Sequence, residues 1–146
     1  MGTTLVAGTF DGEILTVANV GDSRLYLYNG SLKQITTDHS LVEEMIRMGE
    51  LERERARTHP DKNIITRAVG VVEQVDVDFF EVEDISNGDM ILLCSDGLTN
   101  MVEDSEISEI LGMKGSLEDK ARLLVQTANA HGGKDNIAVV LAELYI

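Results

Sequence analysis

Two aspartates stand where an extended apolar segment meets a glycine-containing turn. Asp96 follows the apolar run Met90–Cys94 and precedes Gly97, and Asp135 follows two glycines and a lysine just before an apolar C-terminal segment. Mn2+ and Mg2+ prefer oxygen ligands, and a bridged pair of these ions lowers the pKa of water and clamps a phosphoryl group. If the two carboxylates converge, they predict a divalent-metal site; taken singly, each is better explained as a plain turn.

Context strengthens the metal interpretation, because six motifs occur in a recognisable order. They resemble the later motifs of the bacterial protein phosphatase 2C enzymes, a family of metal-dependent Ser/Thr protein phosphatases. The motifs are Val20-Gly21-Asp22-Ser23-Arg24, Thr37-Asp38-His39-Ser40, His59-Pro60, Thr66-Arg67-Ala68-Val69-Gly70, Leu92-Leu93-Cys94-Ser95-Asp96-Gly97-Leu98 and Gly132-Gly133-Lys134-Asp135-Asn136-Ile137. The resemblance covers essentially the whole chain, but only the later portion of the family's catalytic domain.

The resemblance implies that Asp96 and Asp135 hold a dinuclear Mn2+ or Mg2+ centre, and that Asp38 binds a third ion together with Asp96. Asn136 would then brace Asp135 from outside the metal ligands, and Gly97 would let the backbone crowd close to the site. No catalytic residue is assigned beyond the metal ligands themselves.

Asp22 and Arg24 match a family turn that we interpret as structural. We expect Asp22 to bond backbone amides and Arg24 to pair with a carboxylate. His39 either orients a metal-bound water or makes a structural hydrogen bond, and we favour the structural bond.

The charged segment at about 40–60 corresponds to the family's flap beside the active site, whose mobility is associated there with substrate choice. A solvated pair of helices explains the same charges and is compatible with a flap. The residues that we assign to this flap are Leu41, Met45, Met48 and His59.

By this resemblance the reaction is hydrolysis of phosphoserine or phosphothreonine in proteins by a metal-activated water, without a phosphoenzyme. Phosphoproteins are the expected substrates, among them a partner Ser/Thr protein kinase. The family's upstream arginine, Asn-Glu-Asp and Asp-Gly-Met-Gly-Gly motifs have no counterpart here. We therefore expect the chain to begin within a longer protein and to be inactive alone. The alternative is a non-catalytic fragment or degenerate domain that binds metal or partners.

Short strands are predicted over the first part of the chain. Asp11-Gly12 and Asn29-Gly30 separate runs rich in β-branched and aromatic residues, and they predict tight hairpins within an antiparallel meander. The runs are Thr4–Phe10, Glu13–Val20, Arg24–Tyr28 and Leu32–Ile35. Further extended segments are predicted at Ile64–Val69, at Val75–Val82 with Val75, Val77 and Phe79 on one face, at Asp89–Ser95 and at Asn136–Ile146.

Helices are predicted between these strands. Ser40 and Glu43 form a capping box for a helix that ends at Gly49, a shorter exposed one falls within Glu50–Thr58, and two more follow at Asp104–Leu111 and after Ser116. This order favours an α+β fold rather than a βαβ alternation. The family resemblance implies part of a four-layer α-β-β-α sandwich with antiparallel sheets, as a single partial domain over residues 1–146. An uncovered sheet would let the chain self-associate.

Composition excludes other classes of function. The formal net charge of -14 repels a phosphate backbone, which argues against nucleic acid as a partner. The single cysteine, Cys94, rules out an internal disulfide and fits the reducing cytoplasm, which we take as the location. No apolar stretch reaches the roughly 18 residues of a membrane span, so no membrane contact is expected from this segment.

Overall fold

The two hairpins at the start of the chain belong to different sheets. The computed structural model describes all residues from 1 to 146. One sheet has the order β1-β2-β5, and the other has the order β4-β3-β6-β7, with every pairing antiparallel. The strands are β1 (Leu5–Phe10), β2 (Leu15–Val20), β3 (Arg24–Tyr28), β4 (Leu32–Gln34), β5 (Asp78–Val82), β6 (Met90–Cys94) and β7 (Val139–Glu143).

The predicted meander is therefore wrong, although both predicted hairpins are confirmed. β2 pairs with β5 and β3 pairs with β6, so the chain crosses from one sheet to the other between Val20 and Arg24. The physical reason lies in β3, which is apolar on both faces. Leu25 and Leu27 pack toward β2, while Tyr26 packs toward the helices. A strand that is buried on both faces must lie in a middle layer.

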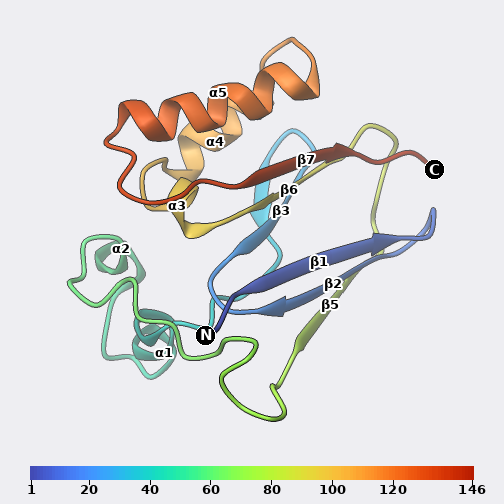
Figure 1. Cartoon of the computed structure of the whole chain (residues 1–146). Helices are drawn as coiled ribbons and strands as arrows, with labels where there is room; N and C mark the ends of the chain where they lie inside the picture. Colours follow the sequence, from blue (N-terminus) through green and yellow to red (C-terminus); the bar gives the residue numbers. More distant parts are fainter.

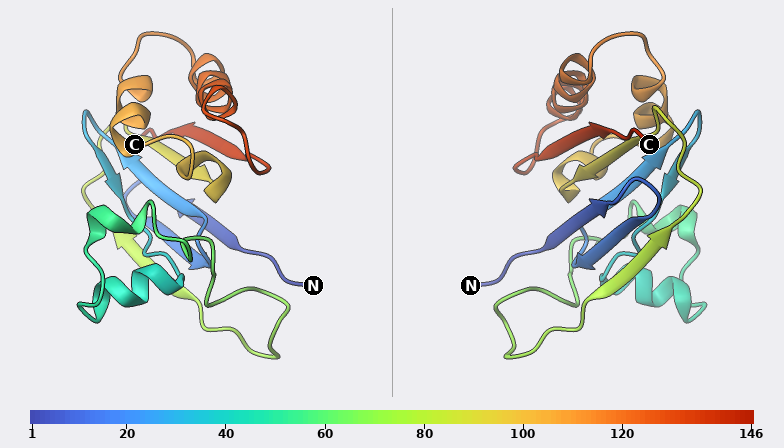
Figure 2. Two further views of the ribbon diagram at one scale, coloured as in Figure 1. Left: turned by 90° about the vertical axis from the view of Figure 1, so that its left-hand side faces the viewer. Right: turned by 90° about the vertical axis from the view of Figure 1, so that its right-hand side faces the viewer.

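Five helices complete the fold: α1 (Leu41–Arg47), α2 (Arg53–Ala56), α3 (Asp96–Thr99), α4 (Asp104–Leu111) and α5 (Leu117–Ala130). Helices α4 and α5 cover the outer face of the β4-β3-β6-β7 sheet, and α1 and α2 lie beyond one end of the strands (Figures 1 and 2). The layers are thus helix, sheet and sheet. This confirms the predicted α+β class with antiparallel sheets.

The helix starts follow from capping. The Ser40 side chain accepts a hydrogen bond from the amide of Glu43 at 3.2 Å, and the Ser116 side chain accepts one from the amide of Asp119 at 3.1 Å. Each satisfies one backbone N–H that the helix leaves without a partner. The predicted helices at 41–48, 104–111 and after 116 are confirmed, whereas α3 was not predicted.

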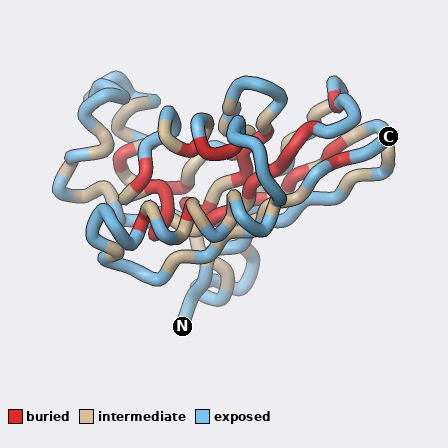
Figure 3. Tube along the Cα trace, turned by 90° about the horizontal axis from the view of Figure 1, so that it is seen from above, coloured by how far each residue is buried: buried red, intermediate tan, exposed pale blue.

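Two apolar clusters hold the layers together. One lies between the sheets and includes Leu15, Leu25 and Ile91, and the other lies between the second sheet and the helices and includes Leu92 and Leu124. Buried segments accordingly run through the middle of the molecule, with exposed loops at both ends (Figure 3).

The β1-β2-β5 sheet has an outer face that no helix covers (Figures 1 and 2). Leu5 and Phe79 are 57% and 69% exposed. They lie on the same face of the sheet, because Leu5 of β1 is opposite Val20 of β2, Phe79 of β5 is opposite Ala18 of β2, and Ala18 and Val20 are two residues apart. The extended segment predicted at Val75–Val82 is shorter in the structure, because β5 begins at Asp78. Phe80 and Val82, not Phe79, pack against the inner cluster.

Two other predictions concern single segments. Ile64–Val69 forms no strand and makes only isolated bridges, Thr3 with Val69 and Ser40 with Ile65. Cys94 is buried, as predicted, and burial raises the pKa of its thiol to about 12. None of the helices has the length and apolar character needed to cross a lipid bilayer.

Candidate metal and phosphate site

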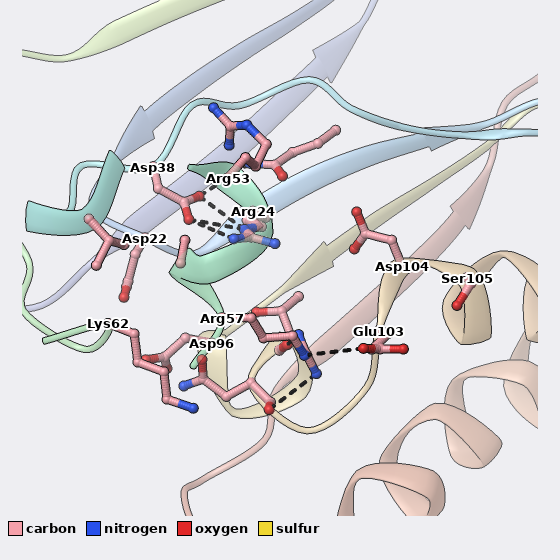
Figure 4. A pocket seen from close by; sticks show the side chains of 15 residues that line it. Asp22, Arg24, Asp38, Arg53, Arg57, Lys62, Asp96, Glu103, Asp104 and Ser105 are labelled. Atoms are coloured by element: carbon pink, nitrogen blue, oxygen red, sulfur yellow. Dashed lines mark hydrogen bonds and ion pairs between the residues drawn. The ribbon is translucent and has the colours of Figure 1, made fainter. Parts of the chain in front are cut away.

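A cleft of about 380 Å³ lies between α1 and α2 on one side and the start of α3 and α4 on the other. Carboxylates from three parts of the chain line it, namely Asp22, Asp38 and Asp96 (Figure 4). Arg53 and Arg57, from α2 and its end, and Lys62 also line it. The cleft therefore combines acidic and basic side chains.

Asp96 is held rigidly at this cleft. It is the first residue of α3 and follows β6 directly, with Ser95 as the N-cap. The Ser95 amide donates to the carbonyl oxygen of Ala138 at 3.0 Å, and the Ser95 hydroxyl accepts from the Ala138 amide at 3.0 Å. Gly97 allows this packing, because a Cβ added there would lie 2.1 Å from the carbonyl oxygen of Asn136.

Asp135 comes from the loop that packs against this turn. Its carboxylate accepts a hydrogen bond from the backbone amide of Asn136 at 2.7 Å, so the bracing of Asp135 comes from the Asn136 main chain. Asp135 lines a smaller hollow of about 260 Å³ together with Gly97, and this hollow shares Lys62 and Asn100 with the larger cleft. The two spaces therefore adjoin.

Electrostatic coupling between the aspartates follows from this arrangement. Burial, and after it the negative charge of Asp135, raises the pKa of Asp96. Burial also raises the pKa of Asp22 to about 6, with further contributions from Asp96 and Asp38. The geometry thus brings Asp96 within range of Asp135 on one side and of Asp22 on the other.

Asp38 differs from these three because it already has a cationic partner. Nη2 of Arg24 donates to Oδ2 of Asp38 at 2.7 Å and Nε donates to Oδ1 at 3.0 Å, in a bidentate pair (Figure 4). Gln34 donates to the same carboxylate at 3.2 Å. The expected pairing of Arg24 with a carboxylate is confirmed. A carboxylate whose oxygens are occupied in this way is a poor metal ligand.

Asp22 shows the reverse pattern. It is buried, and of the backbone amides that it was expected to bond, only its own contributes; its carboxylate has no hydrogen-bond partner in another residue. Asp22 lines the same cleft as Asp38 and Asp96, although it was not among the metal ligands predicted from the sequence. The sequence did contain a relevant signal. Arg24 lies two residues after Asp22 and can pair with one of the two carboxylates, Asp22 or Asp38, which leaves the other free.

The arginine side chain also links the cleft to α4. Nη1 of Arg24 donates to the hydroxyl of Tyr26 at 2.9 Å, and this hydroxyl donates to Oδ1 of Asp104 at 2.8 Å. Tyr26 is fully buried. The Asp38–Arg24 pair is therefore part of a continuous polar network that extends through Tyr26 to Asp104.

The segment 40–60 borders the cleft, but through residues other than those predicted. Val42, Arg53, Ala56 and Arg57 line the cleft, whereas Leu41, Met45, Met48 and His59 do not. Met48 is largely exposed, and His59 holds backbone, as its Nδ1 accepts from the amide of Asp61 at 3.0 Å. The signal that sequence reasoning left unused is the spacing of Arg53 and Arg57, which places two cations on one helical face.

Arg57 docks this segment on α3. Its guanidinium donates to the carbonyl oxygens of Thr99 at 2.6 Å and Asn100 at 3.3 Å, where α3 ends. Asn63 accepts from the Asn100 side chain at 2.9 Å. Both contacts hold the segment against the helix that begins at Asp96.

The residues present fit part of a metal centre. Asp22 and Asp96 are partly buried carboxylates without a cationic partner, and such groups suit a hard divalent cation. No three histidine, cysteine, aspartate or glutamate side chains converge closely enough to hold an ion by themselves.

Comparison with known proteins identifies the family. The family model described as protein phosphatase 2C matches residues 1–137. The serine/threonine phosphatase stp of Listeria welshimeri is 52% identical over 144 residues, which are 98% of this chain and 57% of the relative. Protein phosphatase PhpP of Streptococcus pneumoniae is 45% identical over 146 residues, 99% of this chain and 58% of the relative. The chain thus spans less than three fifths of the length of these relatives.

Solved structures agree with this result. Serine/threonine phosphatase Stp1 from Staphylococcus aureus matches with a TM-score of 0.94 and 40% identity, over 99% of this chain and 57% of that one. The catalytic domain of serine threonine protein phosphatase PstP, solved in complex with two manganese ions, matches with a TM-score of 0.83 and 36% identity, over 100% of this chain and 60% of that one. With nearly its whole length matched in sequence and in three dimensions, this chain belongs to the protein phosphatase 2C family.

Proposed function

We propose that this chain supplies the later part of a catalytic domain that hydrolyses phosphoserine and phosphothreonine in proteins with the help of Mn2+ or Mg2+. The observation that carries the proposal is the meeting of unpaired, partly buried carboxylates in one cleft, Asp22 and Asp96, with Asp135 adjoining them. Mutual repulsion between such groups is relieved by a divalent cation.

We assign the metal ligands within this chain to Asp96, Asp135 and Asp22, for two ions or three in the complete domain. Asp22 replaces the predicted Asp38 in this assignment, because Asp38 is neutralised by Arg24. When bound, the cations activate a water for attack on phosphorus and neutralise the phosphoryl oxygens.

The chain's own residues hold and orient these ligands. Gly97 allows the loop carrying Asp135 to approach α3, and Ser95 ties the two loops together. Lys62, which also lines the cleft, offers positive charge to the phosphate group of a substrate.

A second candidate is a non-catalytic module that binds metal or a partner without turnover. Two observations favour it: no cluster of three ligands is complete within the chain, and the relatives contain a further two fifths of their length that this chain does not match. Under this alternative the chain binds Mn2+ weakly and hydrolyses nothing.

The test measures Mn2+-dependent hydrolysis of a phosphothreonine peptide, and Mn2+ binding by calorimetry. Both are measured for the 146-residue chain and for the same chain extended to the length of its relatives. We expect activity in the extended protein, loss of at least about 100-fold in its Asp96→Asn variant, and little effect of Glu54→Gln, an exposed residue of α2. An inactive extended protein, or an active Asp96→Asn variant, contradicts the assignment.

Partners follow from the same proposal. Phosphoproteins, including a Ser/Thr protein kinase, are the expected substrates.

Self-association is proposed through the uncovered face of the β1-β2-β5 sheet, where Leu5 and Phe79 are exposed. Light scattering at high micromolar concentration checks this. A mass of one chain refutes it, and Phe79→Lys should shift an associating sample toward monomer.

A further inference from the structure

The turn that carries Asp22 lacks the support of either sheet. Residues 21–23 connect β2 in one sheet to β3 in the other. Gly21 has a φ of +111°, and a Cβ added to it would lie 2.4 Å from Cγ2 of Thr4, so the turn is both sterically tight and conformationally unusual. Such a turn must be fixed by contacts from elsewhere in the chain.

His39 provides these contacts to both polar backbone groups of Gly21. The Gly21 amide donates to Nδ1 of the His39 ring at 2.9 Å, and the His39 amide donates to the Gly21 carbonyl oxygen at 2.9 Å. His39 is only 6% exposed. Water therefore cannot readily replace the ring as the acceptor for the Gly21 amide.

The ring itself is oriented from its other side. Because Nδ1 accepts a hydrogen bond, the ring proton is on Nε2, which donates to Oδ2 of Asp78 at 2.7 Å. Oδ1 of Asp78 accepts from Arg67 at 3.0 Å. Asp78 belongs to β5, directly opposite Asn19 of β2, so the ring is anchored to the sheet from which the turn departs.

Asp22 depends on this arrangement because its carboxylate has no partner of its own. Its direction is set by the backbone, and His39 holds the two peptides on either side of Gly21: its ring accepts from the Gly21 amide, and its main-chain amide donates to the Gly21 carbonyl oxygen, which belongs to the peptide that precedes Asp22. We propose that His39 is a positioning residue, which fixes the Gly21-Asp22 turn and so directs the Asp22 carboxylate into the cleft toward Asp96. Both ring nitrogens of His39 are engaged within the protein and His39 does not line the cleft, and this inference rests on the proposed function only in treating Asp22 as a ligand.

Two substitutions separate the two ends of the ring. The amide oxygen of asparagine falls near the place of Nδ1, so His39→Asn keeps an acceptor for the Gly21 amide and loses the bond to Asp78. The longer glutamine reaches toward Asp78 and loses the acceptor, so His39→Gln does the opposite. If His39 is merely structural, the Mn2+ affinity of each variant should fall in step with its loss of stability. If His39 positions the turn, the Mn2+ affinity should instead depend on whether the hydrogen bond to the Gly21 amide is kept.

The experiment uses the 146-residue chain and two readouts. We expect His39→Gln to weaken Mn2+ binding about tenfold and His39→Asn to keep it within about threefold. In metal-free NMR spectra, the amide and carboxyl resonances of Asp22 should move in His39→Gln and stay near their wild-type positions in His39→Asn. Equal movement in both variants, or movement in neither, overturns the inference.

A further variant covers the case in which His39→Gln does not fold. Asp78→Leu leaves the ring in place but removes the acceptor that orients it, and it should also move the Asp22 resonances; unmoved resonances overturn the inference. The Asp22→Asn variant tests the proposed function separately. If it binds Mn2+ as tightly as the wild type, Asp22 is not a ligand, while the metal-free spectra still decide whether His39 positions the turn.

Discussion

Replacing Asp22 with asparagine should stabilise the metal-free chain at neutral pH. Asp22 is a buried carboxylate near two others, and its pKa is raised from 3.8 to about 6. Between these values the folded chain binds more protons than the unfolded chain, so the stability falls as the pH rises through this window. Above pH 6 the full penalty is present, and below 3.8 it vanishes.

The size of the effect follows from the pKa values. One pKa unit corresponds to about 1.4 kcal/mol, so the rise from 3.8 to about 6 sets an upper limit of about 3 kcal/mol. Because the cleft is open to water, we expect screening to leave about 1 to 2 kcal/mol. This corresponds to an increase of about 3 to 6 °C in Tm for a chain of this size.

Urea unfolding followed by circular dichroism, in EDTA at pH 7.5 and again near pH 4, measures this difference. Asp38→Asn is the matched control in the same cleft. It leaves the Arg24 guanidinium without its bidentate partner and should destabilise by about 2 to 3 kcal/mol. Glu54→Gln, an exposed acid outside the cleft, should change stability by less than about 0.5 kcal/mol. The reasoning is refuted if Asp22→Asn is no more stable than the wild type at pH 7.5, or if its advantage is unchanged near pH 4.

Three further predictions concern the elements around the cleft. Gly97→Ala should lower stability by about 2 to 4 kcal/mol in urea unfolding, because its Cβ collides with the Asn136 carbonyl group, and wild-type stability would contradict this. Arg57→Ala should accelerate amide exchange over residues 50–62 while global unfolding changes by less than about 1 kcal/mol, since its bonds to α3 are local; unchanged exchange would show that other contacts hold the segment. Ser116→Ala should cost about 1 kcal/mol in thermal unfolding through loss of the α5 cap, and Ser116→Asp should restore it.

Features that depend on neighbouring residues could be read from the sequence. Ser40 and Ser116 cap the helices that they were predicted to cap, and Gly12 and Gly30 adopt the positive φ that their hairpins require. Each of these depends on hydrogen bonds or sterics within a few residues. The position of Asp96 after a buried strand could be predicted for the same reason, because it depends on the residues nearby in the sequence.

Features that depend on distant partners were predicted less well. The sequence of β3 is compatible with pairing to β2 or to β6, and only the packing of Leu25 and Leu27 between the sheets decides the matter. Which of Asp22 and Asp38 is neutralised likewise depends on where the Arg24 side chain points. Both aspartates are short, acidic and next to turns, so their local sequences do not distinguish a carboxylate that is neutralised from one that is free.

The state of Cys94 has a practical consequence for measuring motion in this molecule. The thiol is buried and burial raises its pKa to about 12, so little of the reactive thiolate is present at pH 8. A cysteine introduced at an exposed position such as Met48 would therefore react with a maleimide dye or spin label almost alone. Fluorescence or electron paramagnetic resonance could then follow the opening of the segment beside the cleft, without first removing the native cysteine.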